Sequence, residues 1–316
     1  MSSNRKADAA GGKRGAPFRQ KERRGARGAD RGDRGERRPE KPVQPARSQS
    51  AEQEDRRPDR LWIYGRHAAL AAIANPKRRI KRIFATDAAL DWIGEARLPL
   101  ERVKPPQKVD AAAIDRLLHE GAVHQGIAVE VDELPRTRLK EACEPDGALS
   151  PVVVLDQVTD PHNIGAVFRS AAAFGARAIV VQDRRTPPLA GALAKAAAGA
   201  VETVPCVEVV NIARALEGLK ALGYFCAGLA SDTDATIDAM PADRPIALVL
   251  GAEGAGLRRL VRMTCDGVYA IPIARDVDSL NISNAAAVAL YEVTRSTRAG
   301  EARSSRKLSK ELIDGV

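Results

Sequence analysis

Short apolar runs without polar interruption recur through the second half of the chain. Stretches whose apolar residues recur at helical spacing separate them. The runs are Val152–Leu155, Ala178–Val181, Tyr224–Gly228 and Ile246–Leu250. The helical stretches are Gly165–Phe174, Ala190–Gly199 and Ile212–Leu222. Because uninterrupted apolar strands are typical of sheets buried on both faces, and because strands and helices alternate, the pattern predicts an α/β domain around a parallel sheet.

This domain is expected to span residues 151–298. Its final helix, roughly residues 281–298, is rich in alanine, which has the highest helix propensity. Residues 299–316 are charged and are expected to form a loose tail.

Residues 61–134 carry a smaller pattern of the same kind. In chain order it predicts a helix entered after Gly65, a short strand at the end of segment 77–85, a helix at 110–120 and a strand at 126–131. We therefore expect a small α/β module here. A linker containing Pro and Gly, residues 135–150, joins it to the larger domain.

Charge is distributed unevenly along the chain. The net charge is +9, and residues 1–60 hold 18 of the 50 Lys and Arg and 10 of the 41 Asp and Glu, a net +8. This segment repeats Arg-Gly units and has few large apolar residues, so it is expected to be disordered. Two roles stay open for it: a sequence-blind tether for RNA phosphates, or a tail that keeps the protein in solution.

Several classes of protein are disfavoured by composition. The chain has no apolar stretch of signal-peptide type and none long enough to span a membrane. Its four cysteines form no CxxC pair and its four histidines no HExxH motif. We expect a reduced, cytoplasmic protein without a metal site.

Three segments place Gly, Asn, Ser or a charged residue directly after an apolar run, where an α/β domain builds its site. The first contains Asn163, Gly165 and Arg169. Asp160 stands where a helix N-cap is expected, and Pro161 suits the turn. Taken alone, this segment predicts a capped helix with a surface arginine.

The second segment is a glycine loop containing Gly251 and Glu253. Three glycines in six residues allow close backbone approach and positive φ, but packing does not explain the glutamate. The loop fails the dinucleotide fingerprint, because the third glycine that the motif requires is absent at Arg259.

The third segment joins Ile271 to Ser279, Leu280 and Asn281. Taken alone, Ser279 could cap the last helix, and Asn281 could belong to its first turn.

In this order, the three segments resemble the SpoU (TrmH-like) branch of the SPOUT RNA methyltransferases, over about residues 61–297. The resemblance implies a trefoil knot in the larger domain, a homodimer, and RNA binding by residues 61–134. It implies S-adenosylmethionine as cofactor, held by the loops at Gly251 and at Ile271 to Leu280, and no metal.

The resemblance also implies catalytic roles for Asn163, Arg169, Glu253, Ser279 and Asn281. Relatives assign the matching arginine as the base, but a guanidinium with a pKa above roughly 12 resists deprotonation. A phosphate clamp that orients the 2′-hydroxyl is the role that its chemistry supports. The family does not assign the proton transfer to a residue that matches His162.

The function implied is S-adenosylmethionine-dependent 2′-O-methylation of ribosomal RNA, at a guanosine in 23S rRNA. Two alternatives stay open: a tRNA ribose methyltransferase, and a non-catalytic RNA-binding factor in ribosome assembly. An oxidoreductase that uses a dinucleotide is disfavoured by the failed fingerprint.

Overall fold

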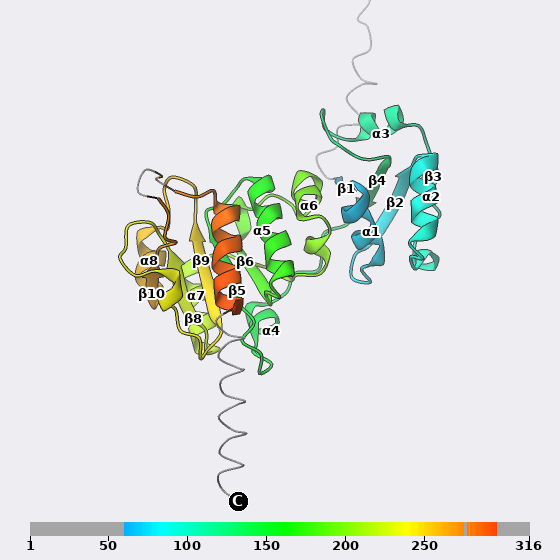
Figure 1. The fold of residues 1–316 in the computed structure, drawn as a ribbon. Helices are drawn as coiled ribbons and strands as arrows, with labels where there is room; N and C mark the ends of the chain where they lie inside the picture. Colours follow the sequence, from blue (N-terminus) through cyan, green and yellow to red (C-terminus); the bar gives the residue numbers. More distant parts are fainter. Residues whose placement is uncertain (1–59, 275–276, 278, 296–316) are drawn as a thin grey trace, which may run out of the picture. The chain divides into compact units, whose positions relative to one another are not determined.

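The computed structural model describes residues 60–274, 277 and 279–295 (Figure 1). The expectations for the basic arm, Arg60 apart, and for the tail at 299–316 lie outside these residues. Within them, no helix is long and apolar enough to cross a membrane. In the same residues, no three or more His, Cys, Asp or Glu side chains gather as a metal site would require.

The larger sheet has six strands, all parallel, in the order β10-β8-β9-β5-β6-β7. The strands are β5 (Val152–Asp156), β6 (Ala178–Gln182), β7 (Cys206–Val209), β8 (Phe225–Leu229), β9 (Ile246–Gly251) and β10 (Gly267–Tyr269). The predicted α/β fold with a parallel sheet is confirmed. The trefoil knot stays a prediction.

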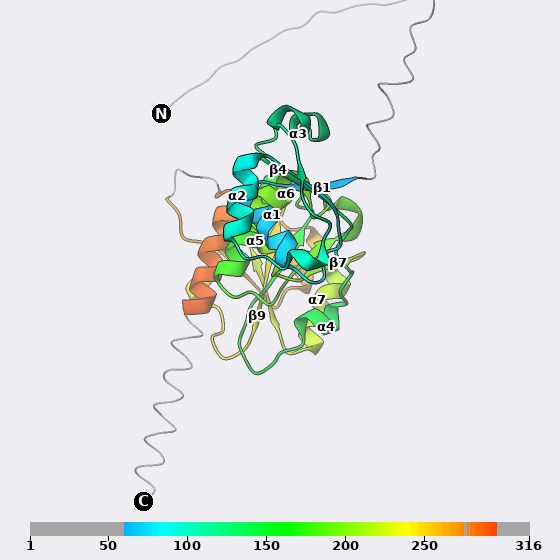
Figure 2. The same cartoon turned by 90° about the vertical axis from the view of Figure 1, so that its right-hand side faces the viewer.

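Helices cover both faces of this sheet. They are α4 (Leu139–Cys143), α5 (Pro161–Ala173), α6 (Gly191–Ala197), α7 (Ile212–Ala221) and α8 (Arg259–Thr264), and residues 282–295 are also helical. Val153 and Leu155 enter a core with α5 and the helix at 282–295, whereas Val152 and Val154 enter a second core with α4 and α7. Figure 2 shows these two layers on either side of β9.

The smaller sheet has four strands in the order β1-β4-β2-β3. Strand β4 pairs antiparallel with β1 and β2, and β3 pairs parallel with β2. The elements are β1 (Leu61–Tyr64), α1 (Arg66–Ala74), β2 (Ile80–Ala85), α2 (Asp87–Glu95), β3 (Gln107–Lys108), α3 (Ala111–Leu117) and β4 (Ile127–Val131).

Three of these elements escape the sequence pattern: β1, β3 and α2. Strand β3 has only two residues, too few for a pattern to appear. Strand β1 is the short run Leu-Trp-Ile-Tyr directly before the helix at Gly65, and it was not predicted as a strand. Helix α2 is capped by Thr86, whose side chain accepts a hydrogen bond from the Ala89 backbone amide. Helix α4 likewise lies inside the stretch expected to be a linker.

Candidate functional site

A pocket of about 600 Å³ opens at the carboxyl ends of β8, β9 and β10. Leu229, Gly251 and Tyr269 are the last residues of these strands, and all three line it. The third sequence segment supplies another wall through Ile271, Ile273 and residues 279–282. Its volume lies in the range of pockets that hold cofactor-sized molecules.

A cluster of three polar side chains adjoins this pocket. Asn163 Nδ2 donates to Glu253 Oε1 at 3.0 Å, and Asn281 Nδ2 donates to the same oxygen at 2.8 Å. Asn281 Nδ2 also lies 3.0 Å from Asn163 Oδ1. The cluster joins residues 118 positions apart in the chain, one from each of the three segments.

Each member of the cluster is placed by local structure. Asp160 caps α5 by accepting a hydrogen bond from the backbone N–H of Asn163 at 2.9 Å, which places Asn163 in the first turn of the helix. Asn281 Oδ1 accepts hydrogen bonds from Ser283 N at 2.9 Å and from Ser283 Oγ at 2.5 Å. The side-chain oxygen of Asn281 therefore caps the last helix, while its side-chain NH₂ group donates to Glu253.

Glu253 stands in a loop that folds back on its own strand. A Cβ on Gly251 would collide with the backbone of Gly256 and Leu257, and Gly254 and Gly256 have φ of 76° and 64°. Gly251 is therefore required by the loop itself, a reason different from the close approach of a cofactor.

An ion pair anchors the far end of this loop. Asp156 ends β5 with 0% exposure, and Arg258 binds it through Nε at 2.8 Å, Nη2 at 2.6 Å and its own amide at 3.0 Å. The loop is thus tied to the neighbouring strand. This pair carries no motif signal, and the sequence interpretation did not include it.

Seven of the eight predicted site residues lie at the pocket or in the cluster. Gly251, Glu253, Ile271, Ser279, Leu280 and Asn281 line the pocket, and Asn163 joins through its hydrogen bonds. Arg169 is exposed two turns along α5, and no hydrogen bond or ion pair ties it to the rest of the described chain. Leu229, Ser231 and Tyr269 also line the pocket, but no motif pointed to them.

The cysteine side chains near the larger sheet are not suited to act as nucleophiles. Burial raises the pKa of Cys143, Cys206 and Cys226 to about 12 and that of Cys265 to about 11, so these thiols stay protonated at neutral pH. Burial also raises the pKa of Tyr269, which keeps its hydroxyl neutral at the pocket wall.

Two family models match the chain. One, described as the SpoU rRNA Methylase family, matches residues 150–291. The other, described as RNA 2′-O ribose methyltransferase substrate binding, matches residues 62–137.

Relatives and solved structures agree with these matches. The chain is 39% identical to the 23S rRNA (guanosine-2′-O-)-methyltransferase RlmB of Burkholderia sp, over 74% of this chain and 95% of the relative. It is 37% identical to the enzyme of the same name in Escherichia coli (strain K12), over 74% of this chain and 97% of the relative.

Among solved structures, the SpoU methyltransferase AviRb from Streptomyces viridochromogenes, in complex with AdoMet, superposes with a TM-score of 0.62 at 24% identity. The superposition covers 75% of this chain and 90% of that one, and it supports the fold alone.

Proposed function

The chain belongs to the SpoU rRNA methylase family, and we propose that it methylates the ribose 2′-hydroxyl of a guanosine in 23S rRNA. Its relatives of that name, 37% and 39% identical, support the choice of RNA. The observation that carries the proposal is the cluster of Asn163, Glu253 and Asn281 beside a pocket of cofactor size.

The pocket fits S-adenosylmethionine in its chemistry. Leu229, Ile271 and Leu280 offer apolar surface, and the loops at Gly251 and at 279–281 expose backbone groups. When bound, S-adenosylmethionine supplies a methyl group activated by its sulfonium charge. That charge disappears on transfer, so an apolar wall does not oppose the reaction.

Glu253 is the residue best placed to accept a hydrogen bond from the ribose. Both amide donors use its Oε1, and within the described part of the chain Oε2 has no partner. A carboxylate held in this way can orient a hydroxyl and take up its proton. Asn163 and Asn281 fix the carboxylate, and Ser279 at the pocket wall provides a further hydroxyl.

Arg169 serves best as a clamp on an RNA phosphate. Its side chain is exposed on α5, the helix that carries Asn163 at its start. A fork of N–H donors that faces solvent is suited to a bidentate phosphate contact. The proposal further includes a homodimer, a cytoplasmic location and RNA binding by the module at 61–134.

The test is methyl transfer from labelled S-adenosylmethionine to purified 23S rRNA and to tRNA, both from a strain lacking the gene. Ribose-methylation mapping should find one guanosine in 23S rRNA methylated. Methylation of tRNA alone would establish the tRNA alternative. Cofactor binding without transfer to either RNA would favour the assembly factor.

A further inference from the structure

A buried ion pair joins the module at 61–134 to the larger domain. Arg78 lies between α1 and β2, and Glu202 ends the 3-10 helix η3 (Ala200–Glu202). Arg78 Nη2 lies 2.6 Å from Glu202 Oε1, and the two side chains are 1% and 3% exposed. Arg78 Nε donates to both carboxylate oxygens, at 3.0 and 3.1 Å.

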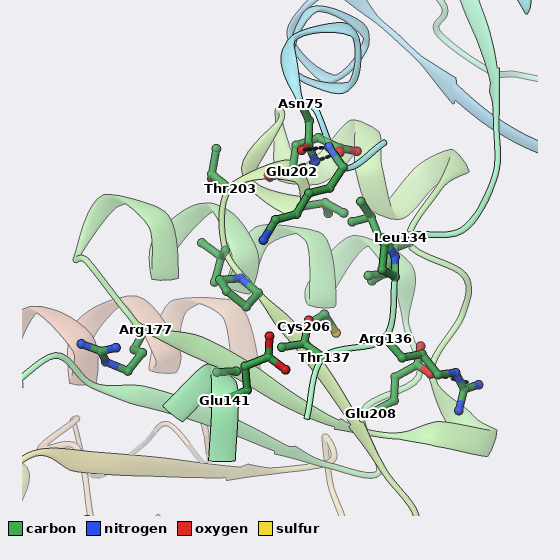
Figure 3. A pocket seen from close by; sticks show the side chains of 17 residues that line it. Asn75, Leu134, Arg136, Thr137, Glu141, Arg177, Glu202, Thr203, Cys206 and Glu208 are labelled. Atoms are coloured by element: carbon green, nitrogen blue, oxygen red, sulfur yellow. Dashed lines mark hydrogen bonds and ion pairs between the residues drawn. The ribbon is translucent and has the colours of Figure 1, made fainter. Parts of the chain in front are cut away.

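The remaining polar atoms of the pair also have partners. Arg78 Nη1 donates to the Asp132 carbonyl at 3.0 Å, and Nη2 to the Leu189 carbonyl at 3.4 Å. Asn75 Nδ2 donates to Glu202 Oε2 at 2.7 Å, a contact shown in Figure 3. Buried pairs often add little stability over apolar residues, but their directional bonds can select one arrangement among several.

The interface around this ion pair consists of small residues, so the orientation of the module depends on directional contacts such as this one. Ala190 and Ala194, on the α6 side, lie in the same buried cluster as Ala68 and Ala72 of α1. A Cβ on Gly199 would lie 2.8 Å from Ala71 Cβ. Flat alanine and glycine surfaces pack closely, but they interlock little and do not resist sliding.

Two further features concern how the module is held on the larger domain. Lys195 Nζ donates to Gln125 Oε1 at 2.7 Å, and the same oxygen accepts the Arg66 amide at the start of α1. Helix α1 is thus held near both ends. On the linker side a cavity of about 360 Å³, lined by Leu134, Glu141 and Glu202 among others, leaves the interface incompletely filled (Figure 3).

Helix α6 and the 3-10 helix η3 both pack against α5, the helix that carries Asn163 of the polar cluster. Gly165 of α5 packs so closely on α6 that a Cβ there would lie 2.5 Å from the Leu193 carbonyl oxygen. Gly165 lies two residues after Asn163. Glu202 belongs to η3, and η3 contacts both α6 and α5. A packed path therefore leads from Arg78 through η3 to α5, the helix that carries Asn163. The close packing of α5 on α6 also explains the glycine in the first sequence segment.

We propose that Arg78 and Glu202 are positioning residues that hold the module on α6 in one orientation, so that the RNA it binds meets the cluster at Asn163. This inference rests on the proposed function for its consequence in catalysis. The pair touches neither the pocket at Gly251 nor the polar cluster. It acts through the placement of the bound RNA.

Two variants of the full chain test the proposal. Glu202→Gln removes the charge while keeping the shape. The pair Arg78→Met with Glu202→Leu replaces the bridge by apolar residues, which should fold even where the single change does not. Glu217→Gln, an exposed carboxylate on α7, is the matched control. Spin labels on noncanonical residues at exposed positions 91 and 214 report the distance between module and domain.

Wild type and control should give one narrow distance distribution, and both bridge variants a broad one. S-adenosylmethionine affinity should stay unchanged, while kcat at saturating RNA falls by about tenfold or more, as expected for a misplaced substrate. Narrow distances or a wild-type kcat in both variants would overturn the inference. Broad distances, together with a wild type that methylates no RNA, would refute the proposed function and still support the bridge.

Discussion

The side-chain amide of Asn281 donates to Glu253 Oε1 at 2.8 Å, which joins the glycine loop to the start of the last helix. With the Asn163 bond to the same oxygen, this leaves Oε2 as the free acceptor of the cluster in the described chain. The role of the Glu253 carboxylate in proton transfer can therefore be tested separately from cofactor binding in the pocket.

Glu253→Gln should lower methyl transfer by about 10²-fold or more, because an amide is a poor proton acceptor and its NH₂ can meet the two donors unfavourably. S-adenosylmethionine affinity should change little, since the pocket walls are retained. Single-turnover transfer and calorimetry measure the two effects. A rate near that of the wild type would remove Glu253 from the proton transfer.

Arg258→Met should destabilise the fold by about 3 kcal/mol, because it leaves the Asp156 carboxylate buried with only one backbone donor. The loop at 251–258 should loosen, and cofactor affinity should fall with it. Chemical denaturation and calorimetry check both. Arg262→Ala is the control, since its partner Asp232 is 73% exposed and the loss should stay within about 1 kcal/mol.

Gly251→Ala should weaken S-adenosylmethionine binding by displacing the Gly256 backbone, and should also lower the unfolding midpoint. Gly94→Ala is the matched control, because a Cβ there meets nothing within 4 Å and the residue lies in helix α2. That change should be neutral or slightly stabilising. Equal cofactor affinity in both variants would show that the loop can relax around the added methyl group.

The sequence predicted the parts of the fold whose signal is local. Uninterrupted apolar runs identified β5, β6, β8 and β9, but β10 is a half-buried Gly-Val-Tyr with no apolar run to mark it. Residues at strand ends could be placed in a site because the carboxyl ends of parallel strands share one edge.

Contacts between distant segments were beyond such signals. Arg78 and Glu202 are 124 positions apart, and Asp156 and Arg258 are 102 apart. No local pattern links either pair. Arg169 shows the reverse limit: the motif names the residue, but it is exposed on α5 and no contact within the described chain tests its role.

Deletion of residues 1–59 should lower RNA affinity and flatten its dependence on salt, because most of the net charge lies there. Methyl transfer to a saturating short RNA should continue. RNA affinity measured at a series of salt concentrations tests this prediction. If the dependence of affinity on salt is the same with and without residues 1–59, the arm is only a tail that keeps the protein in solution.

Arg169→Ala should reduce turnover by about 10²-fold or more while leaving S-adenosylmethionine binding nearly intact, because the side chain is expected to meet RNA and does not line the pocket. Arg169→Lys should restore little, since an ammonium group cannot reproduce a bidentate fork. Stability should change by no more than about 0.5 kcal/mol in either variant, as for other exposed positions.

Single-turnover methyl transfer at saturating cofactor and RNA measures the effect of Arg169. A clamp on phosphate should also appear as a smaller salt dependence of RNA binding in the alanine variant. A wild-type rate in that variant would show that Arg169 only marks the surface of α5. The orientation of the ribose would then rest on Glu253, Ser279 and the two asparagines alone.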